Sequence, residues 1–167
     1  MSQQRPAASG ILQSIGHFIG EVAGGRRQAE QFGESDYRLA AAALLVHVVT
    51  SDHEFDEAQR AKLVDVLAYR FELGQGEAEK LVAAAVKADR EAVDLYHFTS
   101  VLDHALDEEG RRRVIEMMFE IAYTDGKLSE FEDNIIWRAS ELLNIPARDR
   151  VSIRRHVRDE TAEDENK

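Results

Sequence analysis

The sequence contains no cysteine, so disulfide bonds, thiolate metal sites, cysteine nucleophiles and iron–sulfur clusters are all excluded. Only two of its 167 residues are proline, and aromatic residues make up 7%. Basic residues are in the minority, with 21 against 32 acidic ones, which gives a formal net charge of −11. A field of that sign repels nucleic acid and attracts cations, so we expect no nucleic-acid partner. Any bound metal must be held by oxygen or histidine ligands.

No apolar run is long enough to cross a membrane. The longest one, residues 39–49, is interrupted by His47 and falls well short of the ~20 residues that a spanning helix needs. The first ten residues contain only Arg5 as a basic residue, and the apolar stretch after them includes His17 and Glu21, which makes a poor secretory signal. Together with the lack of cysteine, these features predict a cytoplasmic protein.

Apolar residues recur at spacings of three and four through most of the chain, and strand-like alternation is absent. This periodicity predicts an all-α fold, a compact helical domain of about seven or eight helices. We expect three regions: an N-terminal amphipathic helix and linker at 1–34, the helical domain at 35–158, and a disordered acidic tail at 159–167. The N-terminal helix has a single apolar stripe, made by Ile11, Leu12, Ile15, Phe18, Ile19 and Val22.

Residues with short polar side chains predict where the helices begin. One such capping residue precedes each of four apolar-periodic segments: Ser35 or Asp36, Asp56, Asp107 and Ser129. The last helix is expected to begin near Pro146 and to reach about Arg158. Glu108 and Glu109 stand four residues before the second and third arginines of residues 111–113, a favourable spacing for exposed ion pairs, so this arginine triplet is expected to be solvated.

Two loops in the sequence share one pattern. Each follows an apolar helix, begins with an aspartate, Asp52 or Asp125, and has an apolar residue at its fourth position. A capping residue, Asp56 or Ser129, then opens the next helix. Because this agreement spans segments about 73 residues apart, it predicts an internal duplication into two pseudo-repeated helix–acidic loop–helix units.

The loops have two interpretations, and the sequence leaves both open. In the structural one, Ser129 and Glu132 form a capping box, Asp56 and Gln59 form a weaker analogue, and Gly126 ends a helix in the left-handed conformation. In the functional one, clustered carboxylates hold a hard divalent cation such as calcium or magnesium. The candidate metal ligands are Asp52, Glu54, Asp56, Asp125, Glu130 and Glu132.

An EF-hand is excluded, because Glu57 and Leu63 stand in the first loop where glycine and a bidentate glutamate are required. In the second loop Lys127 replaces a ligand, so a cation there needs further oxygens, for example from the first loop. The six histidines do not have zinc-protease spacing, and neither a nucleophile elbow nor a phosphate-binding loop occurs. We therefore expect no catalytic residues, no required cofactor and no enzymatic activity.

Four segments together resemble the tellurite-resistance TerB family, specifically its stand-alone TerB-like bacterial proteins. They read "DYRLAAAALLVHV", "SDHEFDEAQRAKL", "DLYHFTSVLDHALDEEGRRRVIEMMFEIAYTDGKLSEFEDNIIWRASELL" and "IPARDRVSIRRHV", and cover about Asp36 to Val157. The family's aspartate and distant glutamate correspond to Asp125 and Glu132 in the second half. In the first half they correspond to Asp52 and Gln59, so one carboxylate is missing there, and His53 stands in place of the usual glycine.

The resemblance implies an all-helical cytoplasmic domain linked to tellurite or general stress resistance, with an acidic surface expected to bind divalent cations. Related domains also occur at the front of a membrane-associated J-domain co-chaperone. Two hypotheses follow: a non-enzymatic stress-response module that binds a cation or a protein partner, and a metal-free protein-interaction adaptor. Contact of the N-terminal helix with a membrane surface is disfavoured, because its polar face lacks Lys and Arg.

Overall fold

The computed structural model describes residues 32–52 and 54–167. Within these ranges it contains seven α-helices and one short 3₁₀ helix, η2, and no strand, which confirms the all-α prediction. The elements are α2 (Tyr37–Val49), α3 (Glu57–Arg70), α4 (Gln75–Glu91), α5 (Tyr96–Ala105), α6 (Glu108–Ala122), η2 (Tyr123–Asp125), α7 (Glu130–Leu142) and α8 (Ala147–Glu165). No helix of this described part has the length and apolar character needed to cross a membrane. The amphipathic helix predicted at residues 11–22 lies outside the described residues, and the internal duplication stays a prediction.

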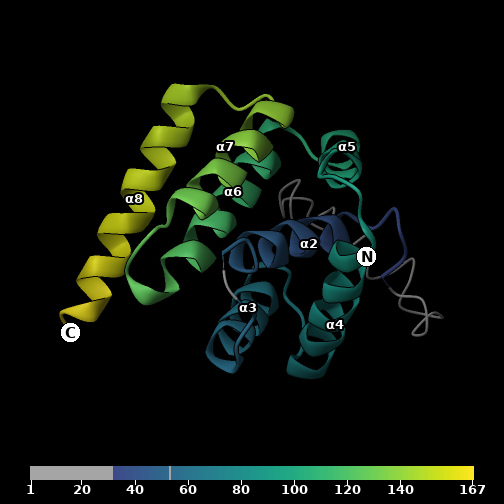
Figure 1. Ribbon diagram of the computed structural model, residues 1–167, viewed down its shortest axis with the longest axis horizontal. Helices are drawn as coiled ribbons and strands as arrows, with labels where there is room; N and C mark the ends of the chain where they lie inside the picture. Colours follow the sequence, from purple (N-terminus) through teal and green to yellow (C-terminus); the bar gives the residue numbers. More distant parts are fainter. Residues whose placement is uncertain (1–31, 53) are drawn as a thin grey trace, which may run out of the picture.

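Helix α2 is the centre of the fold. It crosses the middle of the molecule, with α3 and α4 on one side and α5, α6 and α7 on the other, and it packs against all five (Figure 1). Every residue of α2 except His47 is buried. A helix that is apolar around its whole circumference has no solvent face to present, so the near-continuous apolar run of the sequence becomes the core. His47 uses Nδ1 to contact Asp89 Oδ1 of α4 at 2.7 Å.

The predicted capping residues begin their helices as expected. Asp36 accepts a hydrogen bond from Arg38 N at 2.9 Å, and Asp107 accepts one from Gly110 N at 2.8 Å. Asp56 and Ser129 start α3 and α7, and α8 begins directly after Pro146. These caps could be predicted because each one joins groups at most three residues apart in the chain.

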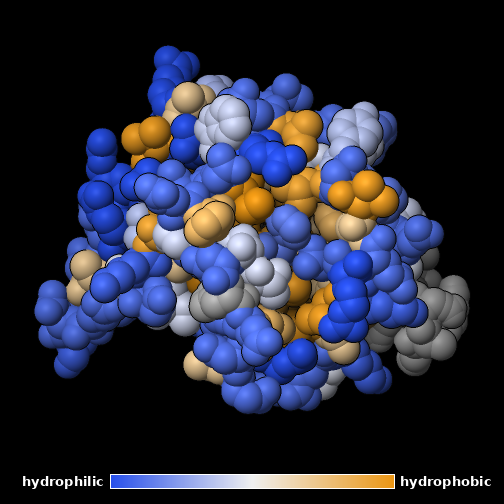
Figure 2. All heavy atoms as spheres, in the orientation of Figure 1, coloured by the Kyte–Doolittle hydropathy of each residue, from blue (hydrophilic) through white to orange (hydrophobic). Residues whose placement is uncertain are grey.

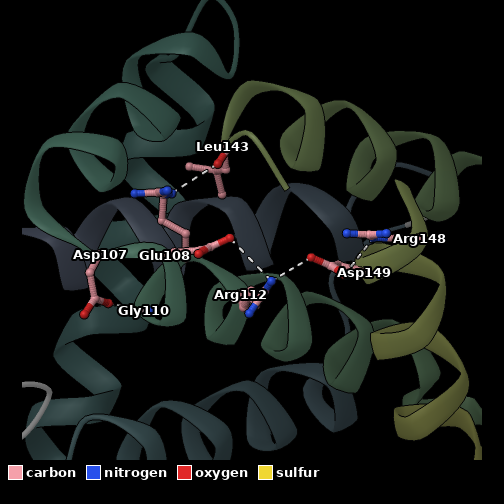
Figure 3. A network of polar contacts seen from close by, with 8 residues as sticks. Asp107, Glu108, Gly110, Arg112, Leu143, Arg148 and Asp149 are labelled. Carbon is pink, nitrogen blue, oxygen red and sulfur yellow. Dashed lines mark hydrogen bonds and ion pairs between the residues drawn. The ribbon is translucent and has the colours of Figure 1, made fainter. Parts of the chain in front are cut away.

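The sequence suggested that the arginine triplet is solvated, but two of its three arginines contact other helices. Arg111 Nε donates to Leu143 O at 3.1 Å and its Nη1 donates to Leu106 O at 3.0 Å, which ties α6 to the ends of α7 and α5. Arg112 Nη2 lies between Glu108 Oε2 at 3.4 Å and Asp149 Oδ2 of α8 at 2.7 Å (Figure 3). Both predicted pairs within α6 are formed, Glu108 with Arg112 and Glu109 with Arg113, but Arg112 is also bound by Asp149 from another helix. The triplet therefore joins the C-terminal helices to each other.

Helix α8 extends to Glu165, so the predicted end near Arg158 is wrong and most of the tail expected to be disordered is helical. Val157 is buried, and Thr161 Oγ1 donates to its carbonyl at 2.9 Å. His156 Nε2 also lies 3.2 Å from Oε2 of Glu160, which is one turn further along the helix. The helix packs against α6 and η2 along the outer edge of the molecule (Figure 1). Its acidic composition suggested disorder, but tertiary contacts and pairs one turn apart support a helix there.

Candidate functional site

The second acidic loop begins where α6 ends. The chain passes through η2, and Gly126 then adopts a left-handed conformation with φ of 84°, the conformation predicted for this glycine. Asp125 Oδ1 accepts a hydrogen bond from Lys127 N at 3.2 Å, so this carboxylate shapes the turn. A reversal this tight directs the chain into α7 within a few residues.

At the start of α7, Ser129 and Glu132 form the predicted capping box. Ser129 Oγ accepts from Glu132 N at 3.1 Å, and Glu132 Oε1 accepts from Ser129 N at 2.9 Å. The two hydrogen bonds satisfy backbone donors that have no partner within the helix. One carboxylate oxygen of Glu132 is thereby committed to the backbone.

The first acidic loop is built in the same way at the start of α3. Asp56 Oδ1 accepts from Gln59 N at 2.8 Å, and Gln59 Oε1 accepts from Asp56 N at 3.2 Å. Asp52 and Glu54 are exposed, and Asp56 is exposed as well. Residue 53 lies outside the described residues. The structural interpretation of the loops is therefore correct in its hydrogen bonding, for the weaker first box as well as for the second.

Glu132 is the one predicted ligand that is buried, with 6% of its surface exposed. Burial raises the pKa of its carboxyl group above the ordinary 4.5, because ionisation inside the protein loses solvation. The hydrogen bond from Ser129 N opposes this rise in pKa, while the negative charges of Asp52 and Asp125 add to it. Asp52 follows α2 and Asp125 ends η2, so the fold brings acids of both loops within electrostatic range of one buried carboxyl group.

The other three candidate ligands are not part of this arrangement. Glu54, Asp56 and Glu130 are exposed, and none of them is among the charges that raise the pKa of Glu132. Asp56 is occupied as a helix cap. Within residues 32–52 and 54–167, no group of three or more histidine, aspartate or glutamate side chains is placed so that it could hold a metal ion.

A further acidic residue reaches the second loop from the C-terminal end of α8. Glu165 lies so close to Gly126 that a Cβ atom on the glycine would be 3.1 Å from Glu165 Oε2. Sequence reasoning missed this neighbour, because it ended the last helix near Arg158. The repeated acidic and helix-compatible residues after that position were the available signal.

Comparison with protein-family models gives a match that covers most of the described domain. A family model described as "Tellurite resistance protein TerB" matches residues 38–155, which run from the first turn of α2 into the middle of α8. Neither the curated proteins nor the solved structures gave a match to this chain. The matched range contains both acidic loops and ends before the last turns of α8, where Glu165 stands.

Proposed function

The chain belongs to the TerB family, associated with tellurite resistance, and from that premise we propose that it is a non-enzymatic, cytoplasmic stress-response module whose two acidic loops jointly attract a divalent cation. One observation supports the proposal: Glu132 is buried, and each acidic loop places one aspartate, Asp52 or Asp125, within electrostatic range of it.

A cation near Glu132 offsets two unfavourable contributions to its ionisation, the loss of solvation and the repulsion by neighbouring carboxylates. The ionised form of a buried carboxyl group has lost solvation, and the two neighbouring aspartates repel it. A divalent ion near these carboxylates would replace part of the lost solvation and offset the repulsion between them. Hard cations such as calcium and magnesium prefer carboxylate oxygens, which are what the loops present.

The described side chains do not form a ready ligand set. No group of three acidic or histidine residues in the described part converges closely enough to hold a metal. One oxygen of Glu132 accepts from Ser129 N, and one oxygen of Asp125 accepts from Lys127 N. A cation is left with the remaining carboxylate oxygens and with water. We therefore expect dissociation constants on the order of 10⁻⁴ to 10⁻³ M, the weak end of the calcium range.

Thermal unfolding of the full chain, first treated with a chelator, tests the proposal. At a calcium or magnesium concentration ten times the dissociation constant, binding to the native state contributes about 1.4 kcal/mol, which raises Tm by roughly 3–5 °C. The reference is sodium chloride at the same ionic strength, because simple screening also reduces repulsion between carboxylates.

Two matched variants locate the effect. Glu132→Gln keeps the capping hydrogen bond but removes the buried charge, so it should abolish the divalent-specific rise. Glu54→Gln removes an exposed carboxylate of the first loop and should keep the rise. The cation proposal fails if divalent ions do no more than sodium chloride, or if the two variants respond alike.

A different feature favours the adaptor function. Phe131 and Leu142 on α7 are 63% and 40% exposed, and their spacing of about three helical turns places them on one face. Large exposed apolar side chains on one face are typical of protein-interaction surfaces. For an adaptor, Phe131→Ser should weaken partner binding while chelator leaves it unchanged, which is the reverse of what the cation module predicts.

A further inference from the structure

An open groove lies between the start of α2, the end of α4 and the start of α5, with a volume of about 570 Å³. Helix α2 contributes Leu39 and Ala40 to its lining, and α5 contributes Phe98. Small side chains, Ala88 and Ala92, line the α4 side and leave room for a backbone to approach. Figure 2 shows apolar atoms at the surface where α5 approaches α2 and α4, among hydrophilic side chains.

The edge of this groove combines an exposed apolar side chain with negative charge. Val93, which follows α4, is 98% exposed, the largest exposure among the large apolar residues of the described part. Three acidic residues also line the groove: Glu34, Glu91 and Asp94. A complementary ligand therefore has an apolar face and positive charge beside it.

The chain itself enters the described domain at this groove. Glu34 lines it, and Phe32, the first described residue, packs against the core. The guanidinium of Arg38 lies 4.9 Å from the centre of the Phe32 ring, which holds the entry point beside the first turn of α2. Whatever precedes Phe32 is thus attached next to the groove.

We propose that this groove is the docking site for residues 11–22 of the same chain. Those residues lie outside the described part, but their sequence places six large apolar side chains on one helical stripe. A stripe of that kind needs an apolar surface to cover it. The groove offers the exposed apolar side chains of Ala92 and Val93, and the small side chains of Ala88 and Ala92 allow close approach of a helix.

Charge supports this occupant. Residues 1–31 contain three arginines and two glutamates, a net charge of +1, whereas the rest of the chain carries −12. Arg26 and Arg27 stand between the apolar stripe and the entry point at Phe32. When the stripe docks, they are tethered near the acidic rim formed by Glu34, Glu91 and Asp94. Opposite charges there favour the docked state.

Tethering selects the chain's own segment over a second copy. About ten residues join Val22 to Phe32, and a flexible linker of that length has an r.m.s. reach of about 17 Å. Short linkers of this kind give effective concentrations on the order of 1 mM. At micromolar protein concentration, the same segment of a second molecule is about a thousandfold more dilute.

Hydrogen exchange of the full chain, followed by mass spectrometry, tests the proposal. Docking predicts that amides of residues 11–22 exchange at least tenfold more slowly in the wild type than in the double variant Ala92→Glu/Val93→Glu. Both substituted side chains are exposed, so the domain itself should stay folded, and unchanged exchange of α2 checks this. The matched control is Tyr69→Glu, an 81% exposed apolar position on α3 outside the groove, which should keep the protection. Phe18→Asp, on the segment, should abolish it.

The absence of cysteine allows an independent measurement. Phe18→Cys combined with Val93→Cys should form an intramolecular disulfide under mild oxidation at micromolar concentration, while Phe18→Cys with Tyr69→Cys should not. The proposal is overturned if the segment exchanges equally fast in the wild type and in the groove variant, or if both cysteine pairs cross-link equally. It is also overturned if protection appears only as protein concentration rises, which indicates a second copy, or only with anionic vesicles, which indicates a lipid surface.

Discussion

The loop after α2 and the loop after α6 open their following helices with the same reciprocal hydrogen bonds, yet the third helical position is Gln59 in one and Glu132 in the other. Gln59 is neutral and only partly buried, whereas Glu132 is buried and lies near acids of both loops. The capping geometry is therefore the same while the electrostatic environment differs. The local sequence pattern sets the capping geometry. Burial decides whether the side chain at the third helical position also has a shifted pKa.

The second loop differs further in its backbone and its neighbours. Gly126 has a φ of 84°, and Glu165 from the end of α8 lies against it. Four variant sets sharpen the comparison between the loops, from the largest expected effect to the smallest.

Gly126→Ala should lower the free energy of unfolding by about 1–2 kcal/mol, because a Cβ atom strains the left-handed conformation. The new atom also lies 3.1 Å from Glu165 Oε2, at the end of a flexible side chain that can move aside. Gly76→Ala is the control, since this glycine lies in α4 with no atom within 4 Å of the added Cβ. The free energy of unfolding of Gly76→Ala should be higher than that of the wild type by about 0.5–1 kcal/mol. Urea unfolding measures both, and a Gly126 variant as stable as the wild type contradicts the prediction.

The caps of the two loops should each contribute about 1 kcal/mol, so Ser129→Ala and Asp56→Ala are expected to lose that amount in urea unfolding. The loss for Ser129→Ala should be at least as large as the loss for Asp56→Ala. Its partner Glu132 is buried, so the backbone donors at the start of α7 are harder for water to reach once the cap is removed. Ser152→Ala, at an exposed position in the middle of α8, should change little. A larger loss at Asp56 than at Ser129 would reverse the comparison.

Stability of the metal-free protein should depend on pH through Glu132 and not through Gln59. The pKa of Glu132 is raised above 4.5 in the folded state, so the native protein holds this proton more tightly than the unfolded chain does. The resulting stability is fully present below pH 4.5 and is lost as pH rises through the folded-state pKa. The loss is about 1.4 kcal/mol for each unit by which the pKa is raised.

Glu132→Gln should therefore flatten the stability profile above pH 4.5, measured by urea unfolding in the presence of chelator. Gln59→Glu introduces the same carboxyl group into the more exposed box and should leave the profile close to that of the wild type. Equal pH dependence in the wild type and Glu132→Gln would show that the buried charge has no measurable cost.

The smallest effect is expected at Asp125. Asp125→Ala removes the 3.2 Å hydrogen bond to Lys127 N, at a cost of about 0.5 kcal/mol, and also removes a charge that repels Glu132. Asp125→Asn keeps the hydrogen bond and removes only the charge, so it should be more stable than Asp125→Ala. Thermal and urea unfolding without divalent ions compare them, and identical stabilities would mean that the turn hydrogen bond contributes nothing.

The features that could be predicted from the sequence are those whose interacting groups are close together in the chain. The helix starts at Asp36, Asp56, Asp107 and Ser129 follow from short-range caps, and the buried α2 follows from its apolar run. The distant partners of Arg111 and Arg112 could not be predicted in this way, because Leu143 and Asp149 lie 32 and 37 residues further along the chain. Of the six candidate ligands only Glu132 is buried, and among the five exposed ones the fold brings Asp52 and Asp125 within electrostatic range of it.

By itself, the sequence determined the all-α fold, the starts of α2, α3, α6, α7 and α8, and the two capping boxes, because periodicity and short-range hydrogen bonds are local properties of the chain. The resemblance of its motifs to the TerB family is confirmed by the family model. Only the tertiary structure decided that Glu132 is buried while Asp56 and Glu54 face solvent, and that α8 continues to place Glu165 against Gly126. The physical reason is that solvation and charge repulsion depend on which distant helices pack together, and the spacing of residues along the chain does not contain that information.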